Sequence, residues 1–264
     1  MNYTEGKLLR INRKGKLLII TDLHGNLEDA KRYQEIWDEF IESGDEVVLT
    51  GDVIHPVPGQ KDHSIEVLEL VKSYDETYSN FHLLLGNHEF SHLSEALVYK
   101  GGVDQTREFE SNVREQFHSR KDYWGRSKLR EYEEYFRSLP IAVKTDNKVF
   151  ISHAGPALSV ETLDDIRNIT QYGYFYVQQL AGMLFKRPGR FNYKDMQIFL
   201  KIVGCNAQVV GHTPVDGYEV VYGMQMVLSS SDTAGKKAYL ELDLEKEIIN
   251  AHDLVNMVKF LDEV

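Results

Sequence analysis

Five largely apolar runs in this sequence each end on glycine together with carboxylate, amide or imidazole side chains. The runs and the residues after them are Leu17–Ile20 before Thr21-Asp22-Leu23-His24-Gly25, Glu46–Thr50 before Gly51-Asp52, Phe81–Leu85 before Gly86-Asn87-His88-Glu89, Lys148–Ile151 before Ser152-His153-Ala154-Gly155, and Ala207–Val210 before Gly211-His212-Thr213. Short apolar runs bounded by turn residues are typical of strands buried on both faces. The carboxyl ends of such strands meet at one edge of a sheet, so we expect the polar residues to gather in one crevice.

The segment between the first two runs predicts a helix. Asn26 is suited to cap its first turn, apolar residues recur near helical spacing, and Gly44-Asp45 ends it near Ser43. Strand, helix and strand within roughly thirty residues indicate a parallel crossover and hence an α/β fold. Later expected elements are helices at Ser64–Tyr74 and Lys194–Val203, a hairpin at Ile141–Ile151, strands at 218–221, 224–228 and 238–242, and a final helix at Leu254–Leu261.

Length and composition favour one domain, 1–264, with a charged helical insertion at about 90–138. A chain of 264 residues can bury a sizeable core without disulfides. The single cysteine, Cys205, excludes an internal disulfide and a thiolate metal cluster. The net charge of -11 argues against bulk nucleic acid as a partner, because phosphate backbones are bound by surplus Lys and Arg.

The start of the chain, Met1 to Lys16, is polar and basic and has no apolar core of a signal peptide. No apolar run approaches the length of a membrane span. We therefore expect a cytoplasmic protein that has no membrane partner.

The polar residues after the five runs are oxygen and imidazole donors without sulfur: Asp22, His24, Asp52, Asn87, His153 and His212. Such a set suits Mn, Fe, Zn or Ni, and it is rich enough for two ions that share one carboxylate. A lone histidine at a strand end is more often structural, but glycines that allow sharp turns accompany all five blocks. The sequence therefore predicts a metal site.

Two adjacent ions can polarise a phosphoryl oxygen and activate a water molecule for in-line attack. The leaving group then needs a proton donor, and His88 beside Asn87 is the candidate because an imidazole holds a proton near neutral pH. An arginine is also expected, because its guanidinium can bind the charged phosphoryl oxygens.

The five blocks, in this order, resemble the signature of the calcineurin-like metallophosphoesterases. Within this family, Asn87-His88-Glu89 resembles the corresponding motif of the serine/threonine phosphoprotein phosphatases and the symmetrical diadenosine tetraphosphatases. The likeness to the family extends over about Lys16 to Leu242. The resemblance implies a four-layer α-β-β-α sandwich. It also implies that Asp22, His24 and bridging Asp52 hold one ion, with Asp52, Asn87, His153 and His212 holding the second.

The same resemblance implies catalytic roles for His88 and for an arginine. His88 would be the general acid. Arg190, ahead of a helix and the His212 strand, is similar in placement to the later phosphate-binding arginine of the family, and Arg187 is its rival.

The departures from the family pattern bear on substrate. The family has an Asp-Arg-Gly triplet after its bridging aspartate, where this chain has Ile54-His55-Pro56-Val57-Pro58-Gly59. His55 is one candidate to replace the missing Asp or Arg, and Asp62 is a further candidate to orient His88. Near the C-terminus, Ser229–Thr233 stands where the family has an Ala-Pro-Asn-Tyr segment over the site.

The function predicted first is a metal-dependent phosphoesterase that hydrolyses phosphate monoesters of phosphoproteins or small molecules by metal-hydroxide attack. Two divalent or mixed-valence ions are expected, with manganese the first choice and iron, zinc or nickel as alternatives. One alternative is a hydrolase of dinucleoside polyphosphates or cyclic nucleotides, whose bases would stack on Tyr172, Tyr174, Phe175 and Tyr176. The other is a metal-binding module without turnover.

Overall fold

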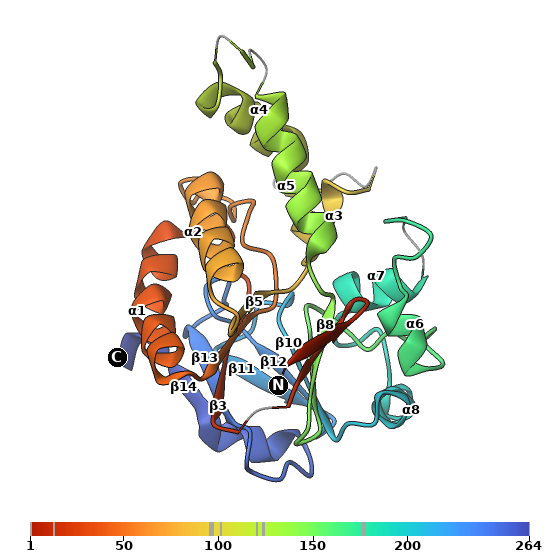
Figure 1. The fold of residues 1–264 in the computed structure, drawn as a ribbon. Helices are drawn as coiled ribbons and strands as arrows, with labels where there is room; N and C mark the ends of the chain where they lie inside the picture. The colour runs from red at the N-terminus through yellow and green to blue at the C-terminus, as the bar shows by residue number, and fades with distance from the viewer. Residues whose placement is uncertain are drawn as a thin grey trace.

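The computed structural model describes residues 2–12, 14–94, 98–100, 102–119, 121–122, 125–175 and 178–263. Two β-sheets lie face to face, and helices cover both outer faces (Figure 1). The predicted α-β-β-α sandwich is confirmed.

The smaller sheet has five strands and carries the first three of the five sequence blocks. Its order is β14 (Val258–Phe260), β13 (Ala238–Asp243), β3 (Lys16–Ile20), β4 (Glu46–Leu49) and β5 (Phe81–Leu83). Strands β3, β4 and β5 are parallel, so their carboxyl ends lie at one edge.

The larger sheet has seven strands and carries the other two blocks. Its order is β1 (Tyr3–Glu5), β2 (Leu8–Ile11), β8 (Ala142–Thr145), β9 (Val149–Ser152), β10 (Ala207–Val210), β12 (Gln225–Leu228) and β11 (Tyr218–Val221). The expected hairpin is the antiparallel pair β8 and β9, and β10 runs parallel to β9. The block strands of this sheet therefore also end side by side.

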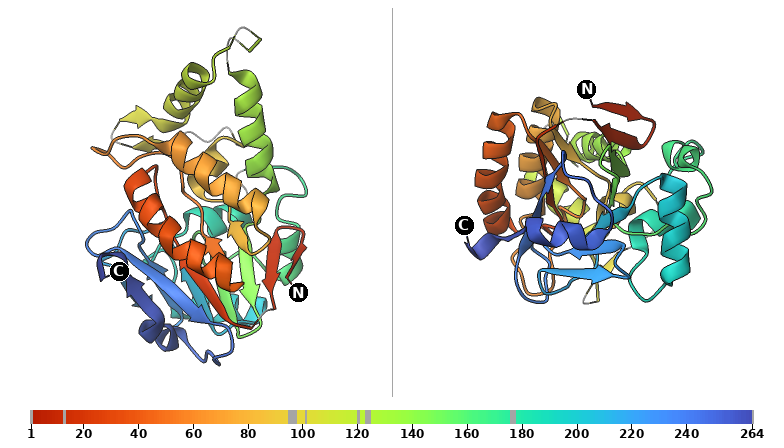
Figure 2. Two further views of the ribbon diagram at one scale, coloured as in Figure 1. Left: turned by 60° about the vertical axis from the view of Figure 1, so that its left-hand side comes forward. Right: turned by 90° about the horizontal axis from the view of Figure 1, so that it is seen from below.

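Helices cover the outer face of each sheet (Figure 2). The five-stranded sheet is covered by α1 (Leu27–Ser43) and α2 (Ser64–Thr77). The seven-stranded sheet is covered by α6 (Leu163–Arg167), α7 (Gln178–Phe185) and α8 (Tyr193–Val203). The Asn26 side chain accepts from the Asp29 N–H at the start of α1, and Gly44 ends the helix with a φ of 80°, as the sequence predicted.

Strand β3 is buried on both faces. Leu17 and Ile19 belong to the hydrophobic cluster between the sheets. Leu18 and Ile20 belong to the cluster beneath the outer helices. This alternation explains why the strand reads as a continuous apolar run.

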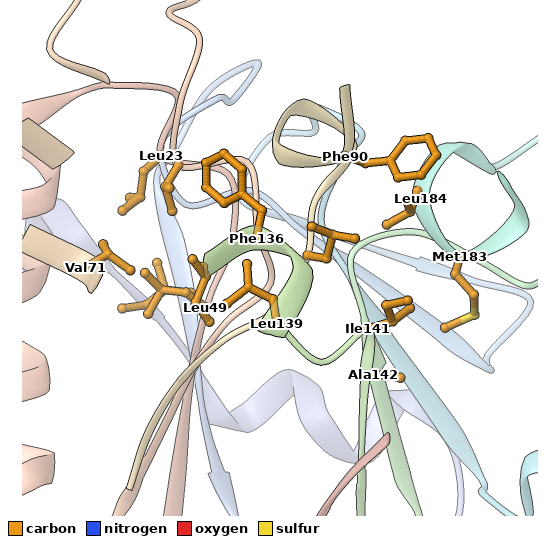
Figure 3. Close-up of a cluster of buried hydrophobic side chains, with 14 of the residues drawn as sticks. Leu23, Leu49, Val71, Phe90, Phe136, Leu139, Ile141, Ala142, Met183 and Leu184 are labelled. Atoms are coloured by element: carbon orange, nitrogen blue, oxygen red, sulfur yellow. The ribbon is translucent and has the colours of Figure 1, made fainter. Parts of the chain in front are cut away.

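The described part of the predicted insertion at about 90–138 contains α4 (Gln105–Gln116), α5 (Arg126–Ser138) and a small sheet of β6 (Tyr99–Lys100) and β7 (Val103–Asp104). The short helix α3 (Asn87–Ser91) leads into it. Helices α4 and α5 rise above the sandwich (Figure 1). Phe136 and Leu139 at the end of α5 lie between Val71 and Leu184, and Phe90 of α3 belongs to the same cluster (Figure 3). The end of α5 thus shares a hydrophobic cluster with the end of α3.

The expected helix at Leu254–Leu261 is wrong. A 3₁₀ helix, Ala251–Met257, leads into strand β14, and a second 3₁₀ turn covers Leu261–Glu263. Val258 and Phe260 pair with Leu240 and Ala238 of β13. Pairing with an otherwise open sheet edge satisfies backbone groups that a helix would leave exposed on β13.

Within the described ranges, none of the helices has both the length and the apolar character that a membrane crossing requires.

Candidate metal centre

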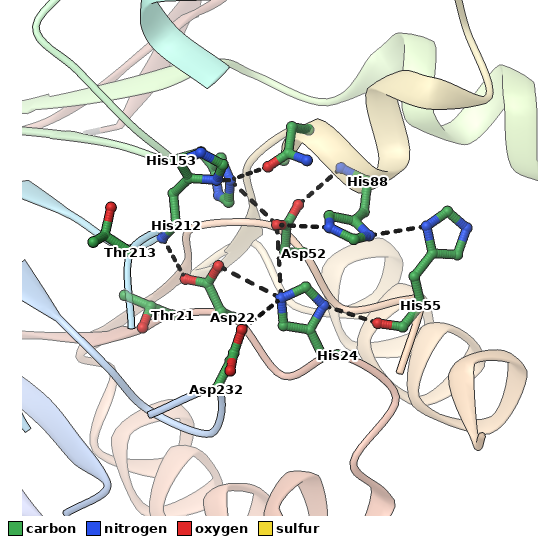
Figure 4. A network of polar contacts seen from close by, with 12 residues as sticks. Thr21, Asp22, His24, Asp52, His55, His88, His153, His212, Thr213 and Asp232 are labelled. Carbon is green, nitrogen blue, oxygen red and sulfur yellow. Dashed lines mark hydrogen bonds and ion pairs between the residues drawn. The ribbon is translucent and has the colours of Figure 1, made fainter. Parts of the chain in front are cut away.

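The ends of strands from both sheets meet at one place. Asp22 and His24 follow β3, Asp52 follows β4, and the start of α3 carries Asn87 after β5. His153 follows β9 and His212 follows β10, so the structure brings all six predicted donors together (Figure 4).

Asp52 lies at the centre of these donors and is 1% exposed. Its Oδ2 atom is 3.3 Å from His153 Nε2, 3.7 Å from His88 Nε2 and 3.9 Å from His24 Nε2. Two groups of side chains close enough to hold an ion share this carboxylate, namely His24, Asp52 and His88, and Asp52, His153 and His212. A carboxylate common to two such groups is what a pair of neighbouring cations requires.

Backbone carbonyls orient two of the imidazoles. His24 Nδ1 lies 2.9 Å from the His55 carbonyl oxygen, and His153 Nδ1 lies 3.1 Å from the Thr50 carbonyl oxygen. Each ring can therefore donate its Nδ1–H to a carbonyl, which leaves the Nε2 lone pair directed towards Asp52. This is the arrangement that metal-binding histidines adopt in proteins.

The second group of donors is tightly gathered. His153 Nε2 is 2.9 Å from Asn87 Oδ1 and 3.1 Å from His212 Nδ1. Asp22 contacts residues of both groups, because its Oδ1 is 4.0 Å from His24 Nε2 and its Oδ2 accepts the His212 N–H at 2.8 Å.

The backbone is strained at these donors. His24, Asp52 and His212 have φ values of 45°, 55° and 63°, a region that non-glycine residues seldom adopt. Such strain gathers at functional sites. A Cβ at Gly86 would lie 2.2 Å from Asp52 Oδ1, and one at Gly211 would lie 2.0 Å from Asp22 Oδ2, so these two glycines let the donors approach.

An imidazolium offsets part of the negative charge of the site. Burial raises the pKa of Asp22 to about 6. Burial acts in the same direction on Asp52, but nearby His153, His88 and His24 outweigh it and hold the pKa of Asp52 well below its usual range. The pKa of His153 rises to about 9, against the effect of burial, because Asp52 stabilises its charged form. A cation can take the place of this proton, and the donor set fits two metal ions.

His88 belongs to a chain of three imidazoles. His88 Nδ1 is 2.9 Å from His55 Nδ1, and His55 Nε2 is 3.0 Å from His92 Nε2. Burial lowers the pKa of His55 well below its usual value, with His88 and His92 adding to the effect, and burial lowers the pKa of His92 to about 4. Both rings are therefore neutral at pH 7, and His55 can accept from His88 while donating to His92.

The two candidate arginines lie in different places. Arg187 lines the same pocket as His24, Asp52 and His88, and its Nε donates to His212 Nε2 at 3.1 Å. Arg190 lines a separate pocket between α7 and the segment after His153. A turn closed by the bond from the Arg190 N–H to the Arg187 carbonyl separates them. The structure therefore does not bring Arg190 to the metal centre.

The other residues singled out in the sequence lie away from the centre. Asp62 accepts from Ser64 and from the Asn112 side chain. Tyr172 and Phe175 line a separate pocket beside α6, and Tyr174 is buried. Tyr176 lies outside the described residues.

Glu89 has a structural role that the sequence analysis did not assign. Its buried carboxylate accepts from the backbone N–H groups of Asp52 at 2.8 Å, Val53 at 2.9 Å and Gly86 at 3.1 Å. Burial and the charge of Asp52 raise the pKa of Glu89 to about 7, and the N–H donors oppose that rise. The signal in the sequence was its place in the third block, two residues after Asn87. The carboxylate ties together the loops that carry Asp52 and Asn87.

We predict that Glu89→Gln weakens Mn²⁺ binding by about 10- to 100-fold, which is the usual effect of losing a residue that holds metal ligands in place without binding the metal itself. The amide cannot accept from all these N–H groups, so the two loops lose their common support. Isothermal titration of metal-free protein measures the affinity, and exposed Glu133→Gln is the control. An affinity equal to that of the parent would show that Glu89 does not support the site.

Two proteins named as serine/threonine phosphatases match most of this chain in sequence. A probable serine/threonine-protein phosphatase of Encephalitozoon cuniculi (strain GB-M1) is 26% identical over 251 residues, which are 87% of this chain and 50% of that protein. A serine/threonine-protein phosphatase of Caenorhabditis elegans is 23% identical over 234 residues, 81% of this chain and 46% of that protein. The chain thus spans about half the length of these two relatives.

Solved structures share the fold. A protein serine/threonine phosphatase from Saccharomyces cerevisiae superposes with a TM-score of 0.64 at 18% identity, over 86% of this chain and 72% of that chain. A cold-active protein-tyrosine phosphatase of a psychrophilic Shewanella species gives 0.62 at 20% identity, over 89% and 77%. The family described as calcineurin-like phosphoesterase matches residues 15–216. The resemblance seen in the sequence is therefore confirmed, and this chain belongs to the calcineurin-like phosphoesterase family.

Proposed function

We propose that this chain is a dinuclear metal-dependent phosphatase that hydrolyses phosphate monoesters. The observation that carries the proposal is that the Asp52 carboxylate belongs to two groups of side chains, each close enough together to hold an ion. The family match and the relatives named as phosphatases support it. A pair of divalent cations held there would polarise a phosphoryl oxygen and make water acidic enough to attack phosphorus near neutral pH.

The proposed ligands divide between the two positions. Asp22, His24 and Asp52 would hold the first ion. Asp52 and three further donors would hold the second, namely Asn87, His153 and His212. Oxygen and imidazole donors without sulfur make manganese the first choice, with iron, zinc and nickel as alternatives.

His88 is the proposed general acid. Its backbone N–H donates to Asp52 Oδ1 at 2.9 Å, and its Nε2 lies beside the Asp52 carboxylate at the pocket. Its Nδ1 is occupied by His55, so the proton for the leaving group would be held at Nε2. His55 thus stands in the place of the aspartate that the sequence lacks, and we propose it as the positioning residue of His88.

Arg187 is the proposed phosphate-binding arginine. It lines the metal pocket, whereas Arg190 does not. If His212 binds an ion through Nδ1, its Nε2 keeps a proton and no longer accepts from Arg187. The guanidinium is then available to a phosphoryl oxygen, which it binds as a charge-assisted fork.

The substrate is proposed only as a class. The relatives and the structural neighbours include proteins named serine/threonine and tyrosine phosphatases, so we propose a phosphoprotein or a small phosphorylated molecule. Placement of Tyr172 and Phe175 at a separate pocket gives no support to base stacking at the metals. We keep the cytoplasm as the proposed location.

We predict that manganese-loaded protein hydrolyses p-nitrophenyl phosphate and that Asp52→Asn loses activity and most bound metal together. A neutral amide cannot serve both ion positions that share this carboxylate. Activity is followed by absorbance and metal content by elemental analysis, with Asp146→Asn in the distant hairpin as the control. Full activity of Asp52→Asn would falsify the proposed function.

The same preparation distinguishes the alternative functions. A panel of phosphoserine and phosphotyrosine peptides, a dinucleoside polyphosphate and a cyclic nucleotide identifies the substrate class. We expect the highest kcat/KM on a monoester. A clear preference for a nucleotide would favour the hydrolase alternative, and two bound ions without any turnover would favour a metal-binding module.

We predict that Arg187→Ala lowers kcat/KM by about two orders of magnitude, because one charged donor to the phosphoryl group is lost. Arg190→Ala is the matched control, since it removes an exposed arginine of the same loop that lines another pocket. Steady-state kinetics with both variants measures the difference. A greater loss in Arg190→Ala would reverse the assignment.

We predict that His55→Ala lowers kcat by about tenfold or more with little change in KM, because His88 loses the partner of Nδ1. His55→Asn should restore much of the rate. Its side-chain oxygen can accept from His88, and asparagine tolerates the φ of 65° at this position. Equal kcat values for the two variants would show that His55 supports only the local packing.

A further inference from the structure

Asp232 lies at the metal centre, although the sequence motif did not include it. It follows β12 in the loop that leads to β13, and it lines the pocket with His24, Asp52 and His88. Its Oδ2 atom is 3.4 Å from His24 Nε2 (Figure 4).

Three carboxylates surround the Nε2 atom of His24. Asp232 Oδ2 is at 3.4 Å, Asp52 Oδ2 at 3.9 Å and Asp22 Oδ1 at 4.0 Å. Atoms that share an ion at about 2.1 Å lie about 3 to 4 Å apart, depending on the angle between them. Asp232 is therefore nearer to His24 Nε2 than either carboxylate already proposed as a ligand.

This convergence of negative charge requires compensation. Asp22 and Asp52 are almost fully buried, and the Asp232 side chain is 18% exposed. Carboxylates that converge in a buried site repel one another unless a cation lies between them. The lone pair of His24 points into the same space, because its Nδ1 is directed at the His55 carbonyl.

The loop before Asp232 is anchored on both sides. Ser230 Oγ accepts from the Thr21 N–H at 2.8 Å, and the Thr21 hydroxyl accepts from the Ser230 N–H at 3.1 Å. Ser231 Oγ donates to Asp29 Oδ2 at 2.6 Å, and Lys237 Nζ donates to Asp29 Oδ1 at 2.7 Å.

Asp232 itself is tied to the strand that carries the first ligands. Its backbone N–H donates to the Asp22 carbonyl at 3.2 Å. Because Ser231 is also held by Asp29 of α1, the backbone that carries Asp232 is fixed beside the pocket. Binding of an ion there would need little rearrangement of this loop.

We propose that Asp232 is a fourth protein ligand of the first ion, a proposal that rests on the dinuclear site proposed above. The first position then has one imidazole and three carboxylates, whereas the second has two imidazoles, an amide and the shared Asp52. More charged oxygen ligands favour a hard cation such as Mn²⁺. The serine-rich segment Ser229–Thr233 thus supplies a metal ligand.

The test is Mn²⁺ titration of metal-free protein by calorimetry, with Asp232→Asn and the control Asp146→Asn. Both positions should fill in the parent and in the control. In Asp232→Asn one ion should bind at least about tenfold more weakly, while the other keeps its affinity, because only one position loses a ligand. Parental affinity for both ions in Asp232→Asn would overturn the proposal.

Thermal unfolding gives a second readout that does not depend on activity. Without metal, Asp232→Asn should melt no lower than the parent, because one of three converging carboxylates is removed. Since ligands that bind only the folded state stabilise it, the Mn²⁺-induced rise in Tm should be smaller in Asp232→Asn than in the parent. An equal rise in the two proteins would also overturn the proposal.

Failure of this inference can be told from failure of the proposed function. If the parent protein binds fewer than two Mn²⁺ ions, the dinuclear site is wrong and Asp232 has no such role. If the parent binds two and hydrolyses p-nitrophenyl phosphate while Asp232→Asn binds both equally well, only the assignment of Asp232 is wrong.

Discussion

A single buried carboxylate, Asp52, sets the geometry of the whole site. Its Oδ2 atom has imidazole nitrogens of His153, His88 and His24 within 3.3 to 3.9 Å. These rings come from different sheets and from α3, so the strand ends must meet for the contacts to form. The Glu89 carboxylate then holds the backbone of Asp52 in place by accepting a hydrogen bond from the Asp52 N–H. The positive φ values and close glycine contacts are the local cost of that convergence.

Much of the fold could be predicted because the relevant signals are local. The continuous apolar run at Leu17–Ile20 and the caps Asn26 and Gly44 identify β3 and α1 directly. Each of the six donors follows an apolar run in the sequence. Because ligands bind at the carboxyl ends of strands, this placement predicted that the six donors meet at one site. The Leu254–Leu261 error arose where pairing with β13 outweighed local helix preference.

The remaining site residues depend on tertiary contacts that cannot be predicted from the spacing of residues in the sequence. Arg187 and Arg190 are both exposed in one basic loop, and only the turn between them decides which lines the pocket. His55 gains its place from a contact with His88, which is 33 residues away. Asp232 is 208 residues from His24 in the chain, and a serine-rich segment carries no motif that would mark it.

The donors of the proposed metal site belong to two separate layers of the sandwich. Asp22, His24 and Asp52 are attached to the five-stranded sheet, and His153 and His212 to the seven-stranded one. Bound ions would therefore cross-link the layers at one edge. Any opening that parts the sheets there must release the ions, so loss of metal and separation of the layers become a single coupled equilibrium.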